Sequence, residues 1–238
     1  MQRILITGAN RGLGLEFSRR FLGRGELVFA CCREPVKADQ LRELKSVYPQ
    51  RLSIISLDVA NPESVATSHH LVKSKVDGLD LLLNNAGIYS VQGSGEPLER
   101  LGSLNFDDAL KLFRINAVAP LIVAQQYLDL LKAGDNAKIV NVSTGYASLT
   151  ENESGFPYYY SASKAAMNML MRSLAADARK MDIITVLLDP GWVSTDMGGP
   201  NAPITPRQAV EGMIKVIDSL TTKDNGRFLN WCGEQVPW

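Results

Sequence analysis

The sequence is poor in histidine and cysteine, and it has no surplus of charge of either sign. Its 238 residues include 2 histidines and 3 cysteines, and 25 basic side chains are balanced by 25 acidic ones. His69 and His70 are adjacent in a polar stretch, which predicts solvent-facing side chains and excludes a catalytic triad built on histidine. Balanced charge gives no reason to expect nucleic acid as a partner, so we expect a small-molecule partner.

Long hydrophobic runs are also absent. No apolar segment approaches the length of a membrane span, and the apolar start of the chain is too short for the core of a signal peptide. Cys31, Cys32 and Cys232 form neither a disulfide framework nor a spaced set of metal ligands, and we expect buried, reduced thiols. The expectation is a cytoplasmic protein with no metal site and no membrane partner.

Short apolar runs, each followed by a longer amphipathic stretch, make up most of the chain. Runs that are apolar on both faces are typical of buried parallel strands. The alternation predicts an α/β fold of the Rossmann type, a doubly wound parallel sheet of about seven strands with helices on both faces. No repeat or Pro/Gly-rich linker divides the chain, so residues 1–238 are predicted to form a single domain. The predicted strands are Ile4–Thr7, Leu27–Cys32, Leu52–Leu57, Leu79–Leu83, Lys138–Val142, Ile183–Leu188 and a weaker Arg227–Leu229.

A glycine-rich loop, Thr7–Gly14, follows the first predicted strand and leads into a helix. Glycine lets the backbone turn tightly and approach a pyrophosphate, and free N–H groups at the start of the helix bind its negative charge. The spacing is G-x-x-x-G-x-G rather than the G-x-G-x-x-G of the commoner dinucleotide fingerprint. Its position between a strand and a helix favours a dinucleotide site over a loop without a ligand.

Further motifs follow in an order that resembles the short-chain dehydrogenase/reductase family over nearly the whole chain. The glycine loop and the Pro-Gly-Trp-Val-Ser-Thr segment near the end are most similar to the sniffer and C-factor-like branch. The family's pattern matches Asp58 and Val59 after the third strand, Asn85-Ala86-Gly87 after the fourth, Asn116 in a helix, Ser143 after the fifth strand, Tyr160-x-x-x-Lys164, and Pro190-Gly191 with Val193 and Thr195 after the sixth.

Tyr160 and Lys164 stand four positions apart, which places them on one face of a helix. A phenol is a poor acid–base group at neutral pH unless its anion is stabilised, and the nearby ammonium of Lys164 and an oxidised nicotinamide ring are both expected to do so. Ser143 is suited to donate a hydrogen bond to a substrate oxygen. The resemblance implies the same roles, and it adds that Lys164 binds the nicotinamide ribose and that Asn116 helps to hold a water in a proton relay.

The resemblance implies a nicotinamide dinucleotide as cofactor. The second strand ends in Cys32-Arg33, and Arg11 lies in the glycine loop, so two cations without an acid favour NADP(H). Glu34, about 20 residues after the last loop glycine, leaves NAD(H) as the alternative. The expected cofactor-binding residues are Gly8, Asn10, Arg11, Gly12, Leu13, Gly14, Arg33, Asp58, Val59, Asn85, Ala86, Gly87, Tyr160, Lys164, Pro190, Gly191, Val193 and Thr195.

The predicted activity is NADPH-dependent reduction of aldehydes, ketones or quinones to alcohols, with Tyr160 as the proton donor. Long loops at Tyr89–Ser103 and Thr144–Pro157 are expected to contact ligands. The short connection from Thr195 to Pro206 predicts a small lid and a broad, hydrophobic substrate range. Candidate pocket walls, which core packing or a dimer contact explains equally well, are Trp192, Met197, Tyr146, Trp231 and Trp238.

Two other functions fit part of the pattern. A dinucleotide-binding signalling protein of C-factor type, with little or no turnover, is the main alternative. A sugar-nucleotide epimerase shares the Tyr–Lys pair but needs a larger carboxyl-terminal domain than this chain has after its Pro-Gly turn. The resemblance also implies a homodimer or homotetramer, with residues 105–131 and 160–180 supplying the contact helices.

Overall fold

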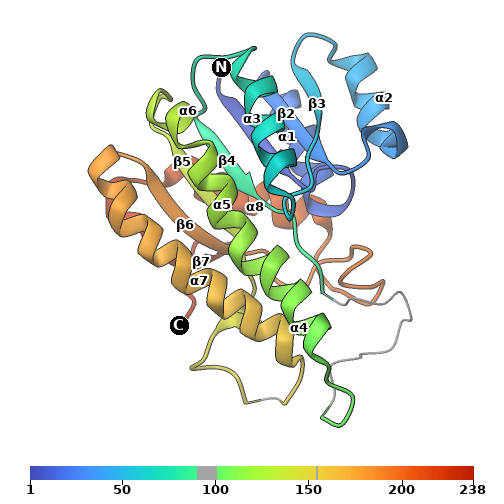
Figure 1. Cartoon of the computed structure of the whole chain (residues 1–238), viewed down its shortest axis with the longest axis vertical. Coiled ribbons are helices and arrows are strands. Elements are labelled where there is room, and N and C mark those ends of the chain that lie inside the picture. The colour runs from blue at the N-terminus through green and yellow to red at the C-terminus, as the bar shows by residue number, and fades with distance from the viewer. Residues whose placement is uncertain (90–100, 154) are drawn as a thin grey trace.

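The computed structural model describes residues 1–89, 101–153 and 155–238, and a parallel sheet runs through its centre (Figure 1). Within these ranges the sheet has seven strands in the order β3-β2-β1-β4-β5-β6-β7, and all neighbours are parallel. The chain returns from the β3 edge to place β4 beside β1, and such a reversal opens a crevice at the carboxyl ends of the two strands. The strands are β1 (Arg3–Thr7), β2 (Leu27–Cys32), β3 (Leu52–Ser56), β4 (Leu81–Asn84), β5 (Lys138–Val142), β6 (Ile184–Asp189) and β7 (Phe228–Asn230).

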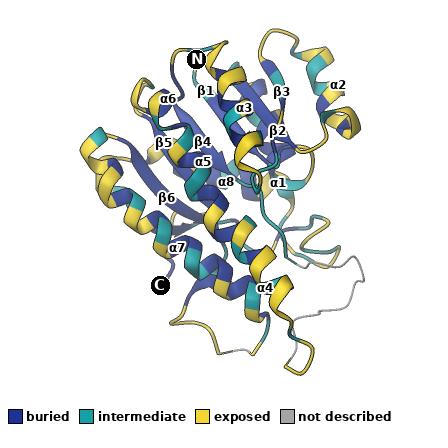
Figure 2. Cartoon of the chain, in the orientation of Figure 1, coloured by how far each residue is buried: buried dark blue, intermediate teal, exposed yellow. Residues whose placement is uncertain are grey.

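Helices cover both faces of the sheet because successive strand residues point to opposite sides. Ile4 and Ile6 of β1 pack into one hydrophobic cluster, and Leu5 packs into the other. The helices turn buried residues toward the sheet and exposed residues outward (Figure 2). One face carries α1 (Gly12–Gly23), α2 (Asp39–Val47) and α8 (Pro206–Ser219); the other carries α3 (Pro62–Lys73), α5 (Ala119–Gln126), α6 (Leu128–Lys132) and α7 (Tyr158–Ala178), with α4 (Phe106–Phe113) leading into α5.

The predicted fold class is confirmed, and the predicted strands differ from the observed ones only near their ends. The fourth strand begins at Leu81 rather than Leu79, and β7 confirms the weak seventh strand. No described helix is both long and apolar enough to cross a bilayer. The predicted ligand loop Tyr89–Ser103 lies mostly outside the described residues, whereas Thr144–Pro157 is described except at residue 154.

The prediction that both histidines face solvent is wrong for His69. Its side chain is buried, and its Nε2 lies 2.8 Å from Asp129 Oδ1. Its ring meets Tyr127 edge to face at 5.3 Å between centroids. The reason is that α3 turns this polar position toward α5 and α6, while His70 remains exposed.

The thiol prediction is also wrong in one place. Cys31 and Cys32 are buried in β2 as expected, but Cys232 is exposed. Cys232 follows β7 in a turn where its main-chain N–H donates to Asn230 Oδ1 at 2.9 Å. A turn held by the Asn230 side chain needs no burial of the Cys232 side chain, which accounts for the difference.

Candidate active site

Hydrogen bonds around the glycine loop join the carboxyl ends of β1 and β4. Thr7 Oγ1 accepts from the main-chain N–H groups of Asn85 and Ala86, each at 3.0 Å. In return, Asn85 Nδ2 donates to Thr7 O at 2.9 Å and to Gly8 O at 3.0 Å. Since both of its amide hydrogens are engaged, Asn85 fixes the shape of the glycine loop.

The predicted loop glycines are required by the backbone itself. A Cβ at Gly14 would lie 2.4 Å from Gly8 O and 2.5 Å from Asn85 Nδ2, so no side chain fits there. Gly8 and Gly12 have φ angles of +64° and +53°, a region that other residues rarely adopt. The loop therefore presents bare backbone, which suits close approach of a pyrophosphate.

The start of α1 adds a site for negative charge. Arg11 precedes the helix in an extended conformation and makes no side-chain capping bond, whereas Asn61 and Thr205 cap α3 and α8. The first-turn N–H groups of α1 are therefore not satisfied by a cap, and they lie at the positive end of the helix dipole. A phosphate group fits this combination.

The segment after β6 approaches the glycine loop from the other side of the crevice. A Cβ at Gly12 would lie 3.6 Å from Thr195 Cγ2, and Arg11 Nη1 pairs with Asp196 Oδ2 at 3.1 Å. Gly191 has a φ of +74°, and a side chain there would meet Ile204. The structure thus brings the predicted segments after β1, β4 and β6 to one edge of the sheet. Of the other predicted residues here, Asn10 is exposed, Leu13 is half-buried, and Pro190 and Val193 are buried.

The end of β2 has the arrangement expected from the sequence. The strand ends at Cys32, so Arg33 is the first residue beyond it. The Glu34 carboxylate forms an ion pair with Lys37, and Lys37 and then Arg33 lower its pKa. The Arg33 guanidinium forms no hydrogen bond or ion pair within the described part of the chain. Beyond the end of β3, Asp58 Oδ1 accepts from Ala60 N at 3.0 Å, and Asp58 and its neighbour Val59 are half-buried.

Three buried polar residues lie one turn apart along α7. Tyr160, Lys164 and Asn168, which we call the α7 row, are 8%, 5% and 3% exposed. Lys164 Nζ donates to the main-chain oxygen of Val142 in β5 at 2.7 Å, and a Cβ at Gly87 would lie 3.6 Å from Nζ. The row therefore runs beside the carboxyl end of β5 and reaches the loop after β4.

Ser143 and Thr144, which follow β5, contact the other two members of the α7 row. Ser143 is 2% exposed, and its Oγ donates to Asn168 Oδ1 at 2.7 Å. Thr144 shares a side-chain hydrogen bond with Tyr160. The structure thus brings Ser143, Tyr160 and Lys164 to the end of one strand.

Asn116 lies in a π-helical turn, Arg114–Val118, between α4 and α5, and it is fully buried. Its Oδ1 accepts from Ile88 N at 2.9 Å, and its Nδ2 donates to Ile88 O at 2.8 Å and to Ser163 Oγ at 3.1 Å. Ser163 Oγ in turn donates to Tyr160 O at 2.8 Å. Asn116 therefore holds the loop after β4 against α7, and interruptions of this kind in a helix are frequent at functional sites.

Burial shifts the pKa values of the two titratable members of the α7 row, Lys164 and Tyr160. It lowers the pKa of Lys164 to about 8, and together with the nearby Asp189 carboxylate it raises the pKa of Tyr160, against a hydrogen bond from Thr144. The lowering of the phenol pKa that the sequence argument expected from the Lys164 ammonium is not among the causes of this shift, and desolvation is the largest of them in the protein alone. The surroundings favour a neutral, proton-bearing Tyr160.

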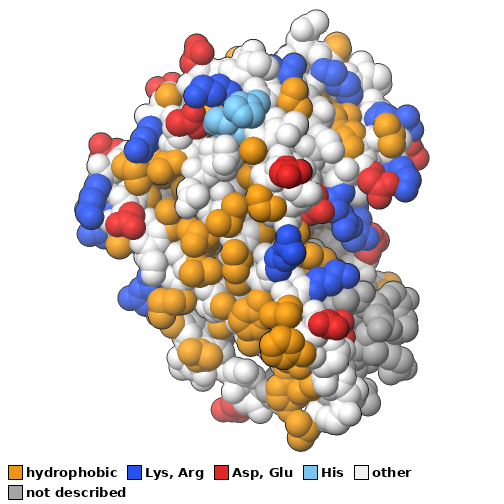
Figure 3. All heavy atoms as spheres, in the orientation of Figure 1, with side chains coloured by type: hydrophobic (Ala, Val, Ile, Leu, Met, Phe, Trp, Pro, Cys, Tyr) orange, Lys and Arg blue, Asp and Glu red, His pale blue; other side chains and the backbone are white. Residues whose placement is uncertain are grey.

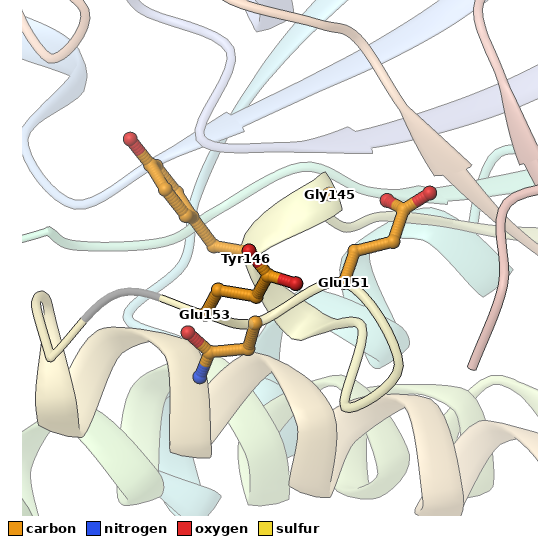
Figure 4. A pocket seen from close by; sticks show the side chains of 5 residues that line it. Gly145, Tyr146, Glu151 and Glu153 are labelled. Atoms are coloured by element: carbon orange, nitrogen blue, oxygen red, sulfur yellow. The ribbon is translucent and has the colours of Figure 1, made fainter.

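A pocket of about 340 Å³ opens beside the end of β5 (Figure 4). It is formed by the loop Thr144–Pro157, which the sequence predicted to contact a ligand. Figure 4 shows the Tyr146 ring pointing away from Glu151 and Glu153. The pocket is lined from Gly145 onward, two residues after Ser143, and its lining includes neither Ser143 nor a member of the α7 row. Its lining residues are Gly145, Tyr146, Glu151, Asn152 and Glu153.

The residues predicted as candidate pocket walls lie in different surroundings. Tyr146 lines the pocket just described. Trp192 and Met197, on the segment after β6, are 57% and 48% exposed. Trp231 packs against the core, and Trp238 lies against the phenylalanine ring of β7, so these two have the packing role that the sequence left open.

Three residues at the site were not singled out from the sequence. Asn168 continues the four-residue spacing of Tyr160 and Lys164, and this signal was readable. Thr144 and Asp189 have only their positions at strand ends to mark them. Burial raises the pKa of Asp189, although the N–H groups of two glycines oppose that shift.

Comparisons with known proteins agree on the family. The model of the short chain dehydrogenase family matches residues 2–203. C-signal of Myxococcus xanthus is 41% identical over 160 residues, which cover 67% of this chain and 93% of that protein. The 1-hydroxy-2-glutathionyl-2-methyl-3-butene dehydrogenase of Rhodococcus sp. (strain AD45) is 34% identical over the full length of both chains.

Solved structures of the same type superpose on the whole chain. NADPH-bound carbonyl reductase from chicken fatty liver has a TM-score of 0.91 at 36% identity, covering 100% of this chain and 99% of that one. Carbonyl reductase Sniffer of D. melanogaster has a TM-score of 0.92 at 32% identity, covering 100% of both. The chain therefore belongs to the short-chain dehydrogenase family of oxidoreductases, in the branch of the sniffer-type carbonyl reductases and C-signal.

Proposed function

We propose that this protein is an NADPH-dependent oxidoreductase that reduces the carbonyl group of aldehydes, ketones or quinones to an alcohol. The observation that carries the proposal is the gathering of Ser143, Tyr160 and Lys164 at the end of β5, beside a glycine loop that excludes side chains at Gly14. The similarity to an NADPH-bound carbonyl reductase over the full chain supports the same activity.

Each of these side chains has a chemical task in the proposed reaction. The bound nicotinamide supplies the hydride. Ser143 donates a hydrogen bond to the substrate oxygen, and Tyr160 delivers the proton that this oxygen needs. The raised pKa of Tyr160 keeps its proton in place at neutral pH before reduction. Lys164 holds the nicotinamide ribose, and Asn116 keeps the surrounding loops in position and holds a water for proton relay.

The cofactor is proposed to lie along the crevice between the ends of β1 and β4. Its pyrophosphate sits on the bare backbone of the glycine loop and the uncapped start of α1. NADP(H) is favoured because the Arg33 guanidinium, at the end of β2, forms no hydrogen bond or ion pair with the residues that the structure describes, while Glu34 pairs with Lys37. The remaining proposed contacts come from residues 8–14, Asp58, Val59, residues 85–87, Pro190, Gly191, Val193 and Thr195.

The test is turnover by the purified protein and its loss in one variant. We expect oxidation of NADPH in the presence of an aromatic ortho-quinone or aldehyde, with Tyr160→Phe reducing kcat roughly 100- to 10,000-fold. NADPH binding should be retained, because the phenol oxygen is lost but the fold is not. Tyr158→Phe is the matched control, since this neighbouring tyrosine is 38% exposed and outside the α7 row. Full activity in Tyr160→Phe would refute the assignment.

We propose a broad, hydrophobic substrate range, because the connection between Thr195 and α8 is short and leaves little chain to form a lid. Initial rates over a panel of unrelated aldehydes and ketones would test this. Similar values of kcat/KM across the panel support it, and strong selectivity for one polar compound contradicts it.

A signalling role is the second candidate, and the similarity to C-signal is the observation that favours it. Such a protein binds the dinucleotide with little or no turnover. Tight NADPH binding without reduction of any carbonyl in the panel would favour this function over the enzymatic one.

We further propose that the protein acts in the cytoplasm as a homodimer or homotetramer. Hydrophobic side chains gather over α4, α5 and α7 (Figure 3). Phe106, Leu110, Val118 and Met169 are each 46% to 76% exposed on or beside these helices. Apolar exposure of this kind on helices marks a contact surface, and sedimentation of the wild type against Phe106→Glu would test it.

A further inference from the structure

The hydrogen bond between Ser143 and Asn168 leaves part of the asparagine side chain unsatisfied. Ser143 Oγ and Asn168 Oδ1 are 2.7 Å apart, and both residues are buried. Asn168 Nδ2 is nevertheless without a hydrogen-bond partner, one of three such buried side-chain atoms in the described ranges. An unpaired buried donor beside a functional side chain needs an explanation, because leaving it unpaired costs free energy.

The serine hydroxyl has one hydrogen, and this limits what it can do. While Ser143 donates to Asn168 Oδ1, it cannot donate to a substrate oxygen. A half-turn of the Asn168 amide exchanges its oxygen and nitrogen at the same place. Nδ2 then donates to Ser143 Oγ, the unpaired donor finds a partner, and the serine hydrogen is released for another acceptor.

The helix places Asn168 where this exchange matters. It is the third member of the α7 row, one turn beyond Lys164 and two turns beyond Tyr160. The other two members contact Val142 and Thr144, the residues on either side of Ser143. All three therefore act on the same short stretch at the end of β5.

We propose that Asn168 is a positioning residue for Ser143. During turnover its amide nitrogen donates to Ser143 Oγ, so that the single hydroxyl hydrogen of Ser143 is directed to the carbonyl oxygen of the substrate. This role rests on the proposed carbonyl reduction and assigns to that reaction a side chain that does not itself touch substrate or cofactor.

Asn168→Asp is the decisive variant because it keeps the shape of the side chain and removes the donor. An ionised carboxylate only accepts, so it holds the Ser143 hydrogen permanently. We expect kcat with NADPH and an aromatic ortho-quinone at pH 8 to fall roughly 100-fold, to the level of Ser143→Ala. KM should change less than about threefold, and the Kd for NADPH should stay near the wild-type value, since neither binding surface is altered.

Acid should rescue this variant and not the wild type. When the introduced carboxylate takes up a proton it regains a donor, and burial favours the protonated form. Between pH 8 and pH 5.5 we expect the kcat of Asn168→Asp to recover at least about tenfold relative to the wild type. A purely structural role for Asn168 would not produce such a pH profile.

Two further measurements keep the inference falsifiable if the carboxylate disturbs folding. Asn168→Leu should lower kcat about tenfold without recovery in acid, and neither substitution should lower it further in a Ser143→Ala background. Thr185→Val is the control, since it removes another buried, unpartnered polar atom in β6, away from the α7 row, and should leave kcat unchanged.

The possible outcomes separate the two proposals. Wild-type kcat in Asn168→Asp, or losses that add to that of Ser143→Ala, would overturn the positioning role alone. Wild-type protein that binds NADPH but reduces no carbonyl would overturn the proposed function and this role with it. Loss of kcat, acid rescue and non-additivity together support the role.

Discussion

The glycine loop and the α7 row lie at the same edge of the sheet, but the loop is formed by main-chain atoms and the row by polar side chains. The loop consists of backbone at positions where no side chain fits, shaped by Thr7 and Asn85. The row consists of buried polar side chains, and the pKa values of two of them, Tyr160 and Lys164, are shifted by their surroundings. A substitution in the loop should therefore damage shape and stability, whereas a substitution in the row should damage chemistry and leave the fold intact or improve it.

The largest effect on stability is expected at Gly14. Because an added Cβ would overlap Gly8 O and Asn85 Nδ2, Gly14→Ala should lower the free energy of unfolding by about 3 kcal/mol. It should also abolish NADPH binding, since the loop must move to make room. Urea denaturation and titration with NADPH measure the two losses.

Gly23→Ala is the matched control for this prediction. Gly23 lies in the same helix, and an added Cβ there meets no atom within 4 Å. This substitution should be neutral or slightly stabilising, because alanine favours a helix over glycine. Equal losses of stability in Gly14→Ala and Gly23→Ala would contradict the claim that the loop position is destabilised by overlap with its neighbours.

A substitution at Lys164 is expected to raise the free energy of unfolding rather than lower it. Burial lowers its pKa to about 8 from an ordinary 10.5, so the charged form is disfavoured in the folded state. The cost is fully present below pH 8 and is relieved as the pH rises toward 10.5, where the unfolded chain also loses the proton. Lys164→Met should therefore be more stable than the wild type by about 2 kcal/mol at pH 7, with the gain disappearing near pH 10.

Lys164→Met should also lose its activity, so this variant tests whether Lys164 is kept for function at the expense of stability. Denaturation at pH 7 and pH 10 provides the measurement. Lys138→Met is a useful control, because Lys138 is also buried but begins β5 at the end away from the site. It should leave turnover unchanged. A Lys164→Met variant that is less stable than the wild type at pH 7 would contradict the argument.

The smallest effect is expected at Arg33, and it concerns cofactor affinity. The proposed preference for NADPH over NADH depends on this side chain. Arg33→Ala should weaken NADPH binding roughly 10- to 30-fold and leave NADH binding nearly unchanged, because only NADPH carries the 2′-phosphate. Parallel titrations with both cofactors measure the ratio. Lys37→Ala is the control, since it frees Glu34 and should favour NADH. A wild type that binds NADH more tightly would sink the proposed preference.

Most of the fold could be read from the sequence because its signals are local. The strands of the parallel sheet are nearly continuous apolar runs, and each helix carries its own periodicity. Tyr160 and Lys164 are related by helical spacing alone, and the loop glycines by their place between a strand and a helix. Such features need no knowledge of distant residues.

The tertiary structure decided what depends on residues far apart in the chain. Ser143 and Asn168 are 25 positions apart, Asn85 and Thr7 are 78 apart, and His69 reaches Asp129 across 60. No spacing predicts such pairs, since they form only when helices pack on the sheet. The upward shift of the Tyr160 pKa also depends on the tertiary structure, because desolvation is a property of the assembled core and not of any motif.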